Sequence, residues 1–475
     1  MRPLELTLAL TALALLLSLR LPRRWDAARP WLDWLPLVAL GVMLLQVLVE
    51  RYRWQLAPLY VLTGVLALLY LRRLRSPARV AAGSHGWRAW AGAALGLLML
   101  LLAVALPILF PVPVLPAPGG PFAIGTLSFE WTDSARPEIY TPDPDDRRSL
   151  MVQVWYPANP APGGAPGPWM ERLDVAGPVI ARYLHLPSFF LDHAALVKTN
   201  SYPAAPLDLA GAPYPVVVYS HGWNGFRTVN LNQSEALASH GYIAVAIDHT
   251  YGAMVTVFAD GRVALNNPAA LPDGVPADEY QRASETVEAT YAADLRYVLD
   301  QLTQLNSGAI PSPLAGRLDM AHVGLYGHST GGGAVILACS QDARCQAGLT
   351  MDAWLEPVPA PVLAQGLAKP FLFMRSQVWA AGVNEPLLNT LYGAAQADEY
   401  RLVIQGTKHY DYTLLPLLTP LAPALGLNGP IEGRRGMAII TDYLLAFFDR
   451  YLKGQPSALL DGPAPGYPEV NFERR

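Results

Sequence analysis

The stretch that decides the fold is VGLYGHSTGGGAVILA at residues 323–338. Its first part, residues 323–326, is an apolar run typical of a buried strand, and residues 332–338 are helix-like. Between them stands the pattern G-x-S-x-G, centred on Ser329. A strand-to-helix turn this tight strains its central residue and leaves little room for side chains beside it, which favours glycine. The sequence therefore predicts a serine hydroxyl raised above the edge of a sheet.

This strand, turn and helix form the nucleophile-elbow pattern of the α/β-hydrolases, in which serine, acid and histidine follow in that chain order. Ser329 needs an imidazole to take its proton and a carboxylate to orient that imidazole. Of the nine histidines, only His409 lies C-terminal to the elbow, apart from His328 inside the motif. Because a strand-like stretch at 400–405 and a short turn precede it, His409 is the predicted base, at the carboxyl end of a strand.

The acid should end an earlier strand after the elbow. Asp352 follows the strand-like residues 347–351 and is our predicted acid. Three other aspartates fit less well. Asp342 lies in a polar connection, Asp398 precedes the strand that leads to the histidine, and Asp411 comes after it. We expect these three to be solvated loop charges or helix caps.

Acyl transfer also needs donors aimed at the oxyanion of the tetrahedral intermediate. One should be the backbone N–H of Thr330, directly after the nucleophile. The other should come from an early junction of strand and loop, and the apolar run at 215–220 opens into His221-Gly-Trp223-Asn-Gly-Phe. The N–H of Trp223 is the candidate second donor. We expect His221 to brace this loop by packing rather than to transfer protons.

Five motifs carry a family resemblance: SHGWNGFR at 220–227, ASHGY at 238–242, GHSTGG at 327–332, MDAWLEP at 351–357 and GTKH at 406–409. In order and spacing the chain resembles the plasma-type (isoform II) platelet-activating-factor acetylhydrolases. Members of that family are calcium-independent serine lipases that cleave short or oxidised sn-2 acyl groups from phospholipids. The resemblance implies Ser329 as nucleophile, Asp352 as acid, His409 as base, and the Trp223 and Thr330 amides as the oxyanion hole.

Two positions depart from the vertebrate form of that family. Thr330 stands where the vertebrate enzymes carry an aromatic residue, and Trp223 stands where they carry leucine. Both predicted donors are backbone groups, so we expect the mechanism to survive these changes. The shape of the acyl pocket, and with it the substrate, does not transfer.

The N-terminal part is a different kind of chain. It holds four apolar stretches of roughly spanning length, at 4–19, 34–49, 55–71 and 90–110. A hydrocarbon core near 30 Å needs about 20 residues in a helix. The first stretch resembles a signal peptide, but it lacks a small-residue cleavage site and another apolar stretch follows at once. We therefore expect an all-α transmembrane domain of about four helices at residues 1–111.

The connections between these stretches carry four, two and five arginines in turn. By the positive-inside rule the first and third connections are cytoplasmic. Four spans then put the N-terminus and the remaining chain on the extracytoplasmic side, a prediction that one missed span would overturn. The proline-rich residues 112–120 predict a stiff linker, which leaves 121–475 as the catalytic domain.

Composition agrees with this division. The 475 residues provide ample material for a large core, and the spans raise the hydrophobic fraction to 52%. A net charge of −4 argues against a nucleic-acid partner. Cys339 and Cys345 are the only cysteines; they match no zinc pattern, and an external location permits a disulfide between them. Without a dinucleotide loop, phosphate loop or metal-binding histidine pair, we expect neither cofactor nor metal.

Strands alternating with helices predict an α/β fold with a mostly parallel central sheet. The expected strands lie at 122–131 and 150–156, which open as an antiparallel pair, and at 216–220, 242–247, 323–326, 347–351, 370–374 and 401–405. The expected helices lie at 228–240, 278–306, 332–338 and 436–452.

Two features stay open. Asp248 and His249 both precede Ser329, so we expect them to brace the structure or to border the pocket. Residues 414–427, rich in leucine and proline, line the acyl pocket or touch the bilayer, or equally pack as ordinary core.

The sequence thus predicts a membrane-anchored serine ester hydrolase that works through an acyl-enzyme on lipid or amphiphilic esters, which a membrane concentrates. An alternative within hydrolases is a general carboxylesterase acting on xenobiotic or polyester substrates. An alternative from another class is a catalytically silent membrane sensor or scaffold, because four spans exceed what anchoring requires.

Overall fold

The computed structural model describes residues 1–19, 30–75 and 87–475, and these divide into two compact units. The first unit is Met1–Pro113 together with the short segments Phe189–Ala194 and Leu418–Leu421, and the second holds the remaining residues. The arginines predicted in the first connection, and Arg79 in the third, lie outside the described residues.

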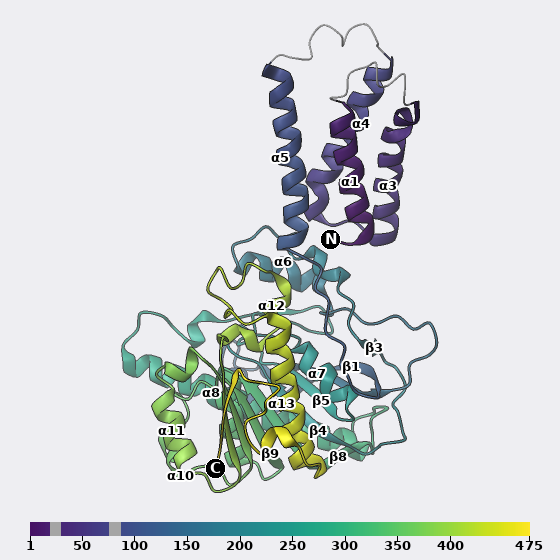
Figure 1. Cartoon of the computed structure of the whole chain (residues 1–475). Helices are drawn as coiled ribbons and strands as arrows, with labels where there is room; N and C mark the ends of the chain where they lie inside the picture. Colours follow the sequence, from purple (N-terminus) through teal and green to yellow (C-terminus); the bar gives the residue numbers. More distant parts are fainter. Residues whose placement is uncertain (20–29, 76–86) are drawn as a thin grey trace. The chain divides into compact units, whose positions relative to one another are not determined.

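The first unit is helical. Its helices, side by side in Figure 1, are α1 (Pro3–Ser18), α3 (Leu35–Glu50), α4 (Ala57–Arg75) and α5 (Trp87–Leu109). Three helical stretches are long and apolar enough to cross a membrane: Pro30–Glu50, Trp54–Arg75 and Trp90–Leu109. The remaining helix, α1, has 16 residues and is shorter than a typical span.

Polar side chains gather at one end of this helical unit. The Arg53 guanidinium is buried and donates to the carboxylate of Glu5, with 2.8 Å between Nε and Oε1. Arg53 also donates to the carbonyl oxygen of Phe110 at 3.4 Å, and Arg2 binds Glu50. These contacts bring the start of α1 and the end of α5 to the same end of the bundle.

The second unit is built on a ten-stranded sheet with the order β12-β11-β10-β9-β8-β4-β5-β2-β1-β3. The strands are β1 (Ala123–Pro137), β2 (Arg147–Ala158), β3 (Ser201–Pro203), β4 (Tyr214–Ser220), β5 (Ile243–Asp248), β8 (Leu318–His328), β9 (Cys345–Met351), β10 (Phe371–Ser376), β11 (Glu399–Ile404) and β12 (Val470–Arg474). The six strands from β11 to β5 run parallel, whereas β2 is antiparallel to both β1 and β5, and β12 is antiparallel to β11. A separate hairpin joins β6 (Val255–Val257) to β7 (Val263–Leu265).

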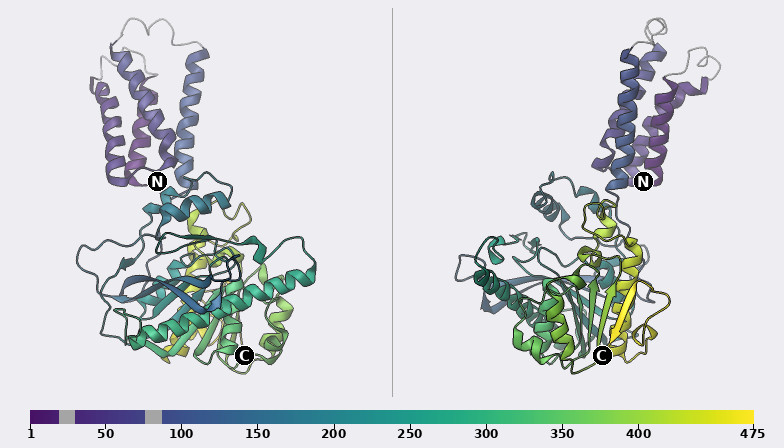
Figure 2. Two further views of the ribbon diagram at one scale, coloured as in Figure 1. Left: turned by 180° about the vertical axis from the view of Figure 1, so that it is seen from behind. Right: turned by 60° about the vertical axis from the view of Figure 1, so that its left-hand side comes forward.

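Helices pack on both faces of this sheet (Figure 2). They are α6 (Leu173–Tyr183), α7 (Leu231–Ser239), α8 (Ala277–Ser307), α9 (Thr330–Gln341), α10 (Ala360–Gln365), α11 (Glu385–Gly393), α12 (Leu415–Leu418) and α13 (Gly433–Lys453). Side chains that alternate along β8 meet different partners. Leu325 joins the core formed with α8 and α9, whereas Tyr326 contacts Phe448 of α13 with 6.3 Å between ring centroids. Because helices cover both faces of the sheet, the sequences of the central strands are nearly continuous runs of apolar residues.

The prediction of a mostly parallel α/β sheet is confirmed, and the opening antiparallel pair is β1 with β2. Two details differ. The helix expected at 228–240 begins only at Leu231, because residues 228–230 belong to the preceding turn. Strand β12, near the C-terminus, was not expected, since it is short, mostly polar and preceded by prolines, and it forms only by pairing with the edge of β11.

The leucine- and proline-rich residues 414–427 do not behave as one segment. Leu414 and Ala422 are buried, Leu425 is 66% exposed, and Leu418–Leu421 belongs to the helical unit. The alternative of ordinary core packing therefore does not describe all of this stretch, whereas pocket lining and contact with the bilayer stay predictions.

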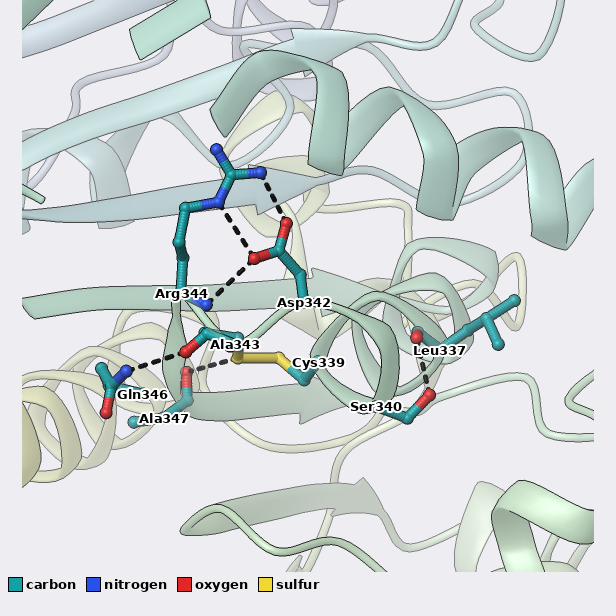
Figure 3. The surroundings of a disulfide bond; sticks show 9 residues. Leu337, Cys339, Ser340, Asp342, Ala343, Arg344, Gln346 and Ala347 are labelled. Carbon is teal, nitrogen blue, oxygen red and sulfur yellow. Dashed lines mark hydrogen bonds and ion pairs between the residues drawn. A yellow bond between two sulfur atoms is a disulfide. The ribbon is translucent and has the colours of Figure 1, made fainter. Parts of the chain in front are cut away.

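The two cysteines form a disulfide between the end of α9 and the start of β9 (Figure 3). Beside it, Arg344 donates to the carboxylate of Asp342 with 2.6 Å between Nη2 and Oδ2, which closes the same turn. The bond therefore joins the helix that follows Ser329 to the strand that leads to Asp352.

Candidate active site

The elbow is formed as its glycines require. Ser329, between β8 and α9, has φ 55° and ψ −122°, a conformation that costs of order 1–3 kcal/mol for a residue with a side chain. A Cβ at Gly331 would lie 2.1 Å from the carbonyl oxygen of Ser220, and one at Gly327 would lie 2.1 Å from the carbonyl oxygen of Gly331. Only glycine allows this approach, which leaves the Ser329 side chain partly exposed at the carboxyl end of the sheet.

The carboxylate of Asp352 is held in one orientation. Asp352 follows β9 with φ 46° and is fully buried. Its oxygens accept hydrogen bonds from the backbone N–H of Ser376 at 2.7 Å and from the Ser376 hydroxyl at 2.6 Å. The remaining partner is Nδ1 of His409, at 3.1 Å from Oδ2. The structure thus brings the predicted acid and the predicted base together.

The imidazole of His409, in the turn η6 (His409–Tyr412), lies between two rings. Trp379 stacks on it with 4.3 Å between centroids and 15° between planes, and His328 lies 4.4 Å away. Nε2 of His328 donates to the carbonyl oxygen of His409 at 3.0 Å. Burial lowers the pKa of the His328 imidazole well below its ordinary value, and His409 adds to that effect. His328 is therefore a neutral neighbour. Because Nδ1 of His409 faces Asp352, Nε2 is the nitrogen left to act as the predicted base.

The serine-to-histidine step of the predicted triad is not closed in this structure. Among the described residues, no hydrogen bond joins the Ser329 hydroxyl to His409, although His409 contacts the residue directly before Ser329. Catalytic hydrogen bonds of ligand-free enzymes are often long and tighten only when substrate binds.

The other three aspartates of the sequence analysis have different partners. Asp342 binds Arg344, Asp398 accepts from the Tyr451 hydroxyl at 2.7 Å, and Asp411 accepts from the backbone N–H of Gly429 at 2.7 Å.

The predicted oxyanion loop lies against the elbow. A Cβ at Gly222 would come within 2.8 Å of Cβ of Ser329. The backbone N–H of Trp223 points at the side-chain oxygen of Thr330, 3.3 Å away. The two predicted donor residues are therefore adjacent, and the Trp223 amide donates to the Thr330 hydroxyl.

Two residues that orient this arrangement escaped the sequence analysis. Ser376, at the carboxyl end of β10, fixes the Asp352 carboxylate, and Trp379, in the turn η5 (Trp379–Ala381), supports the His409 ring. A signal for Ser376 existed, because the ends of neighbouring parallel strands meet at one edge of a sheet. Trp379 had no such signal, since its place depends on the path of a loop.

Asp248 and His249, at the end of β5, make hydrogen bonds inside the sheet unit. Asp248 binds Arg227 through both its backbone N–H and its guanidinium, and His249 bonds Ser220 and Asp294. Within the described ranges, no group of three or more His, Cys, Asp or Glu side chains is arranged to hold a metal ion.

Comparison with known proteins matches residues 113–457 to the family model described as platelet-activating factor acetylhydrolase, isoform II. The chain is 26% identical over 272 residues to a platelet-activating factor acetylhydrolase of Cavia porcellus, covering 54% of this chain and 61% of that relative. It is 25% identical over 403 residues to a protein of Arthroderma benhamiae named "Probable 1-alkyl-2-acetylglycerophosphocholine esterase", covering 76% and 93%.

Among solved structures, a ferulic acid esterase from Streptomyces cinnamoneus superposes with a TM-score of 0.64 at 28% identity, covering 76% of this chain and 99% of that one. That likeness agrees with the sheet order and the elbow described above in showing an α/β-hydrolase fold. Since the family model spans well over half of its residues, the chain belongs to the platelet-activating factor acetylhydrolase isoform II family.

Proposed function

We propose that this protein is a membrane-anchored serine ester hydrolase that cleaves short or oxidised sn-2 acyl groups from phospholipids. The observation that carries the proposal is the hydrogen-bonded pair of Asp352 and His409 beside the strained Ser329 turn. The family match and the α/β-hydrolase fold support it.

In the first step, Nε2 of His409 takes the proton of the Ser329 hydroxyl while Oγ attacks the ester carbonyl carbon. The developing oxyanion accepts hydrogen bonds from the backbone N–H groups of Trp223 and Thr330. At the Trp223 amide the oxyanion takes the place of the Thr330 hydroxyl oxygen. The bond from the carbonyl carbon to the leaving oxygen then breaks, and the alkoxide leaves with the proton from His409. Asp352 holds the imidazole in the required tautomer throughout.

In the second step, water loses a proton to His409 and attacks the acyl group on Ser329. The tetrahedral intermediate again places its oxyanion at the two amides. Collapse releases the carboxylic acid and returns the proton to the serine oxygen. Each half-reaction begins and ends with a neutral imidazole, so no metal or cofactor is needed.

We propose that the catalytic unit faces the extracytoplasmic side. The arginine-rich first and third connections support this orientation by the positive-inside rule. The Cys339–Cys345 disulfide supports it independently, since such bonds persist in oxidising compartments and are rare in the cytosol. Cysteines introduced near Gly120 test it: labelling by an impermeant reagent on intact cells is expected, and labelling only after lysis would reverse the orientation.

The substrate class is tested with the purified, detergent-solubilised full chain. Phosphatidylcholines with sn-2 groups from acetyl to palmitoyl are compared with a simple aryl acetate. Cleavage that fades with chain length is the expected result. Cleavage of the aryl ester alone would favour a general carboxylesterase, and cleavage of neither would favour the silent sensor.

Two variants make that assay specific. Ser329→Ala is the blank, because it removes the proposed nucleophile. Ser340→Ala is its matched control, since the same change falls near the far end of α9 on an exposed serine whose hydroxyl donates to the Leu337 carbonyl. Equal activity of the two variants would remove the serine mechanism.

A further inference from the structure

A second serine, histidine and aspartate are hydrogen-bonded in series inside the sheet unit. The hydroxyl of Ser220 lies 2.8 Å from Nε2 of His249, and Nδ1 of His249 lies 3.0 Å from Oδ2 of Asp294. Because the carboxylate accepts from Nδ1–H, Nε2 must accept from the serine hydroxyl. We call these three residues the buried relay.

The buried relay is closed to substrate. The side chains of Ser220 and His249 are completely buried, and Asp294 is equally inaccessible. Tyr291 covers the His249 ring, with 3.8 Å between centroids and 15° between planes. The guanidinium of Arg148 binds both oxygens of Asp294, at 3.1 and 2.6 Å. No ester carbonyl reaches this serine, so its hydrogen bonds serve another purpose.

The relay ends where the oxyanion loop begins. Ser220 is the last residue of β4 and pairs with Ile247 of the parallel strand β5, so His249 lies just beyond the neighbouring strand end. The backbone carbonyl of Ser220 is also the group against which Gly331 of the elbow packs. A displacement of Ser220 would therefore shift both the oxyanion loop and the elbow, which carry the two predicted donors.

A histidine links the relay to the loop. Nε2 of His221 accepts from the backbone N–H of His249 at 3.1 Å, and Nδ1 of His221 donates to the carbonyl oxygen of Gly222 at 2.7 Å. This pair of bonds requires the neutral tautomer with its proton on Nδ1. Burial lowers the pKa of His221 well below its ordinary value, and His249 adds to that effect, which is consistent with the neutral ring.

The loop itself rests on the turn that His249 opens. The N–H of Asn224 donates to the carbonyl oxygen of Gly252 at 2.9 Å, and the N–H of Met254 donates to that of Gly225 at 3.0 Å. Gly252 in turn donates to the carbonyl oxygen of His249 at 2.9 Å. The backbone on both sides of Trp223 is thus tied to a segment whose first residue the relay holds.

We propose that Ser220, His249 and Asp294 are positioning residues that hold the backbone N–H of Trp223 at the place where the oxyanion forms. The proposal rests on the proposed function, since it assigns a role within that reaction. An oxyanion donor acts mainly in the transition state, and loss of one such donor lowers kcat by about 10²–10³. A displaced donor should lose less, so we expect relay variants to lower kcat about 10- to 100-fold with KM nearly unchanged.

The first test is Ser220→Ala against Ser201→Ala in the full chain. Ser201 is the matched control: it is equally buried and its hydroxyl bonds the buried Glu235, but it lies on β3 at the far edge of the sheet. We expect Ser220→Ala to lower kcat. It should lower the affinity for an arylboronic acid, which forms a tetrahedral adduct on Ser329, by the same factor. Ser201→Ala should shift Tm similarly and leave both values within about twofold.

A second pair separates positioning from folding. His249→Gln keeps an amide donor for Asp294 and an acceptor for Ser220, whereas His249→Leu has similar size and neither group. Recovery of kcat in the glutamine variant relative to the leucine variant is expected. Equal kcat in these two variants at equal Tm, or a Ser220→Ala enzyme with unchanged kcat and boronate affinity, would reduce the relay to ordinary packing.

Amide hydrogen exchange gives a readout that needs no activity. We expect Ser220→Ala to speed exchange of residues 222–226 and Ser201→Ala to leave it unchanged. Unchanged exchange in both would overturn the positioning role. If the wild-type chain is inactive but exchange behaves as expected, the proposed function fails, whereas the buried relay still positions the loop.

Discussion

The molecule holds two sets of serine, histidine and aspartate, the predicted triad of Ser329, His409 and Asp352 and the buried relay. They share one contact, the hydrogen bond between the aspartate carboxylate and Nδ1 of the histidine. In one, His409 lies 3.1 Å from Asp352 and its side chain is 22% exposed beside Ser329. In the buried relay, the same aspartate-to-Nδ1 bond is 3.0 Å, but every member is sealed. Residue types and hydrogen-bond order are therefore insufficient to define an active site.

Backbone conformation separates the two serines. Ser329 is lifted out of the strand by a positive φ of 55°, and neighbouring glycines let it protrude. Ser220 still belongs to β4 and keeps its place in the sheet ladder. A strand residue turned into the core has no face open to substrate, so its hydroxyl can only hold the structure.

The charge around the two acids differs as well. Although burial opposes ionisation, Arg148 and His249 hold the pKa of Asp294 below its ordinary value. Asp352 is instead oriented by the neutral donors of Ser376. Because Arg148 already balances the charge of Asp294, this aspartate stabilises a protonated His249 less than an unpaired carboxylate would. Asp294 therefore suits a permanent structural role rather than that of a catalytic partner.

The largest expected contrast is between the two serines. Ser329→Ala should lower kcat by roughly 10⁶-fold, the scale known for removal of a catalytic serine, against about 10- to 100-fold for Ser220→Ala. Initial rates on an aryl acetate measure both. Losses of equal size would show that the comparison between an exposed and a buried set is mistaken.

The two aspartates should differ next. Asp352→Asn is expected to lower kcat about 10⁴-fold, because an amide at this place favours the wrong imidazole tautomer, as in the Ser-His-Asp proteases. Its Tm should change little, since the amide oxygen still accepts from Ser376. A triad acid elsewhere in the chain would be indicated by near-normal kcat in this variant. The control is Asp398→Asn, since Asp398 is exposed and binds the Tyr451 hydroxyl away from His409.

Removing the disulfide should affect stability rather than chemistry. Replacing Cys339 and Cys345 by alanine opens a loop with a sequence separation of 6 residues, for which chain entropy gives a loss of about 2 kcal/mol. We expect a lower Tm with kcat unchanged, because close glycine contacts hold the elbow. A matching fall in kcat would mean that the bond between α9 and β9 maintains the catalytic geometry.

Acid should weaken the fold through its buried histidines. Burial lowers the pKa of His221, His249 and His328, so the unfolded chain binds more protons than the folded one once the pH falls below about 6.5. Stability contributed by the neutral rings is present above that pH and lost below it. Each such ring adds up to about 1.4 kcal/mol per pH unit.

The measurement for this prediction is thermal unfolding of the full chain between pH 7.5 and pH 5. His249→Gln should reduce the number of protons taken up on unfolding by about one, so the unfolding free energy should depend less steeply on pH. An unaltered slope would mean that the folded protein already protonates this ring, contrary to the tautomer assigned in the relay.

The smallest expected effect concerns the side chain next to the nucleophile. Thr330→Val removes the oxygen that now accepts from the Trp223 amide, yet both proposed oxyanion donors are backbone groups. We expect kcat to change less than about threefold. A loss near the 10²-fold scale of an oxyanion donor would assign the threonine hydroxyl to the hole as a third donor.

The sequence carried much of the fold. Apolar runs and glycine-flanked turns located the central parallel strands, and the chain order of the hydrolase pattern left His409 as the predicted base. Strand β12 was missed because its existence depends on an open edge of β11 rather than on its own composition. The start of α7 was misjudged because no local signal separates a turn from a first helical residue there.

By itself, the sequence located the central strands with the helices between them and the apolar N-terminal stretches, and it required a sharp turn at Ser329. These properties follow from steric and apolar constraints that act between near neighbours in the chain. Only the tertiary structure decided that Ser376 and Trp379 flank the Asp352–His409 pair, and that Ser220, His249 and Asp294 meet in the interior. Sheet order brings residues from distant segments together and seals one serine while it exposes the other, and no local pattern records that choice.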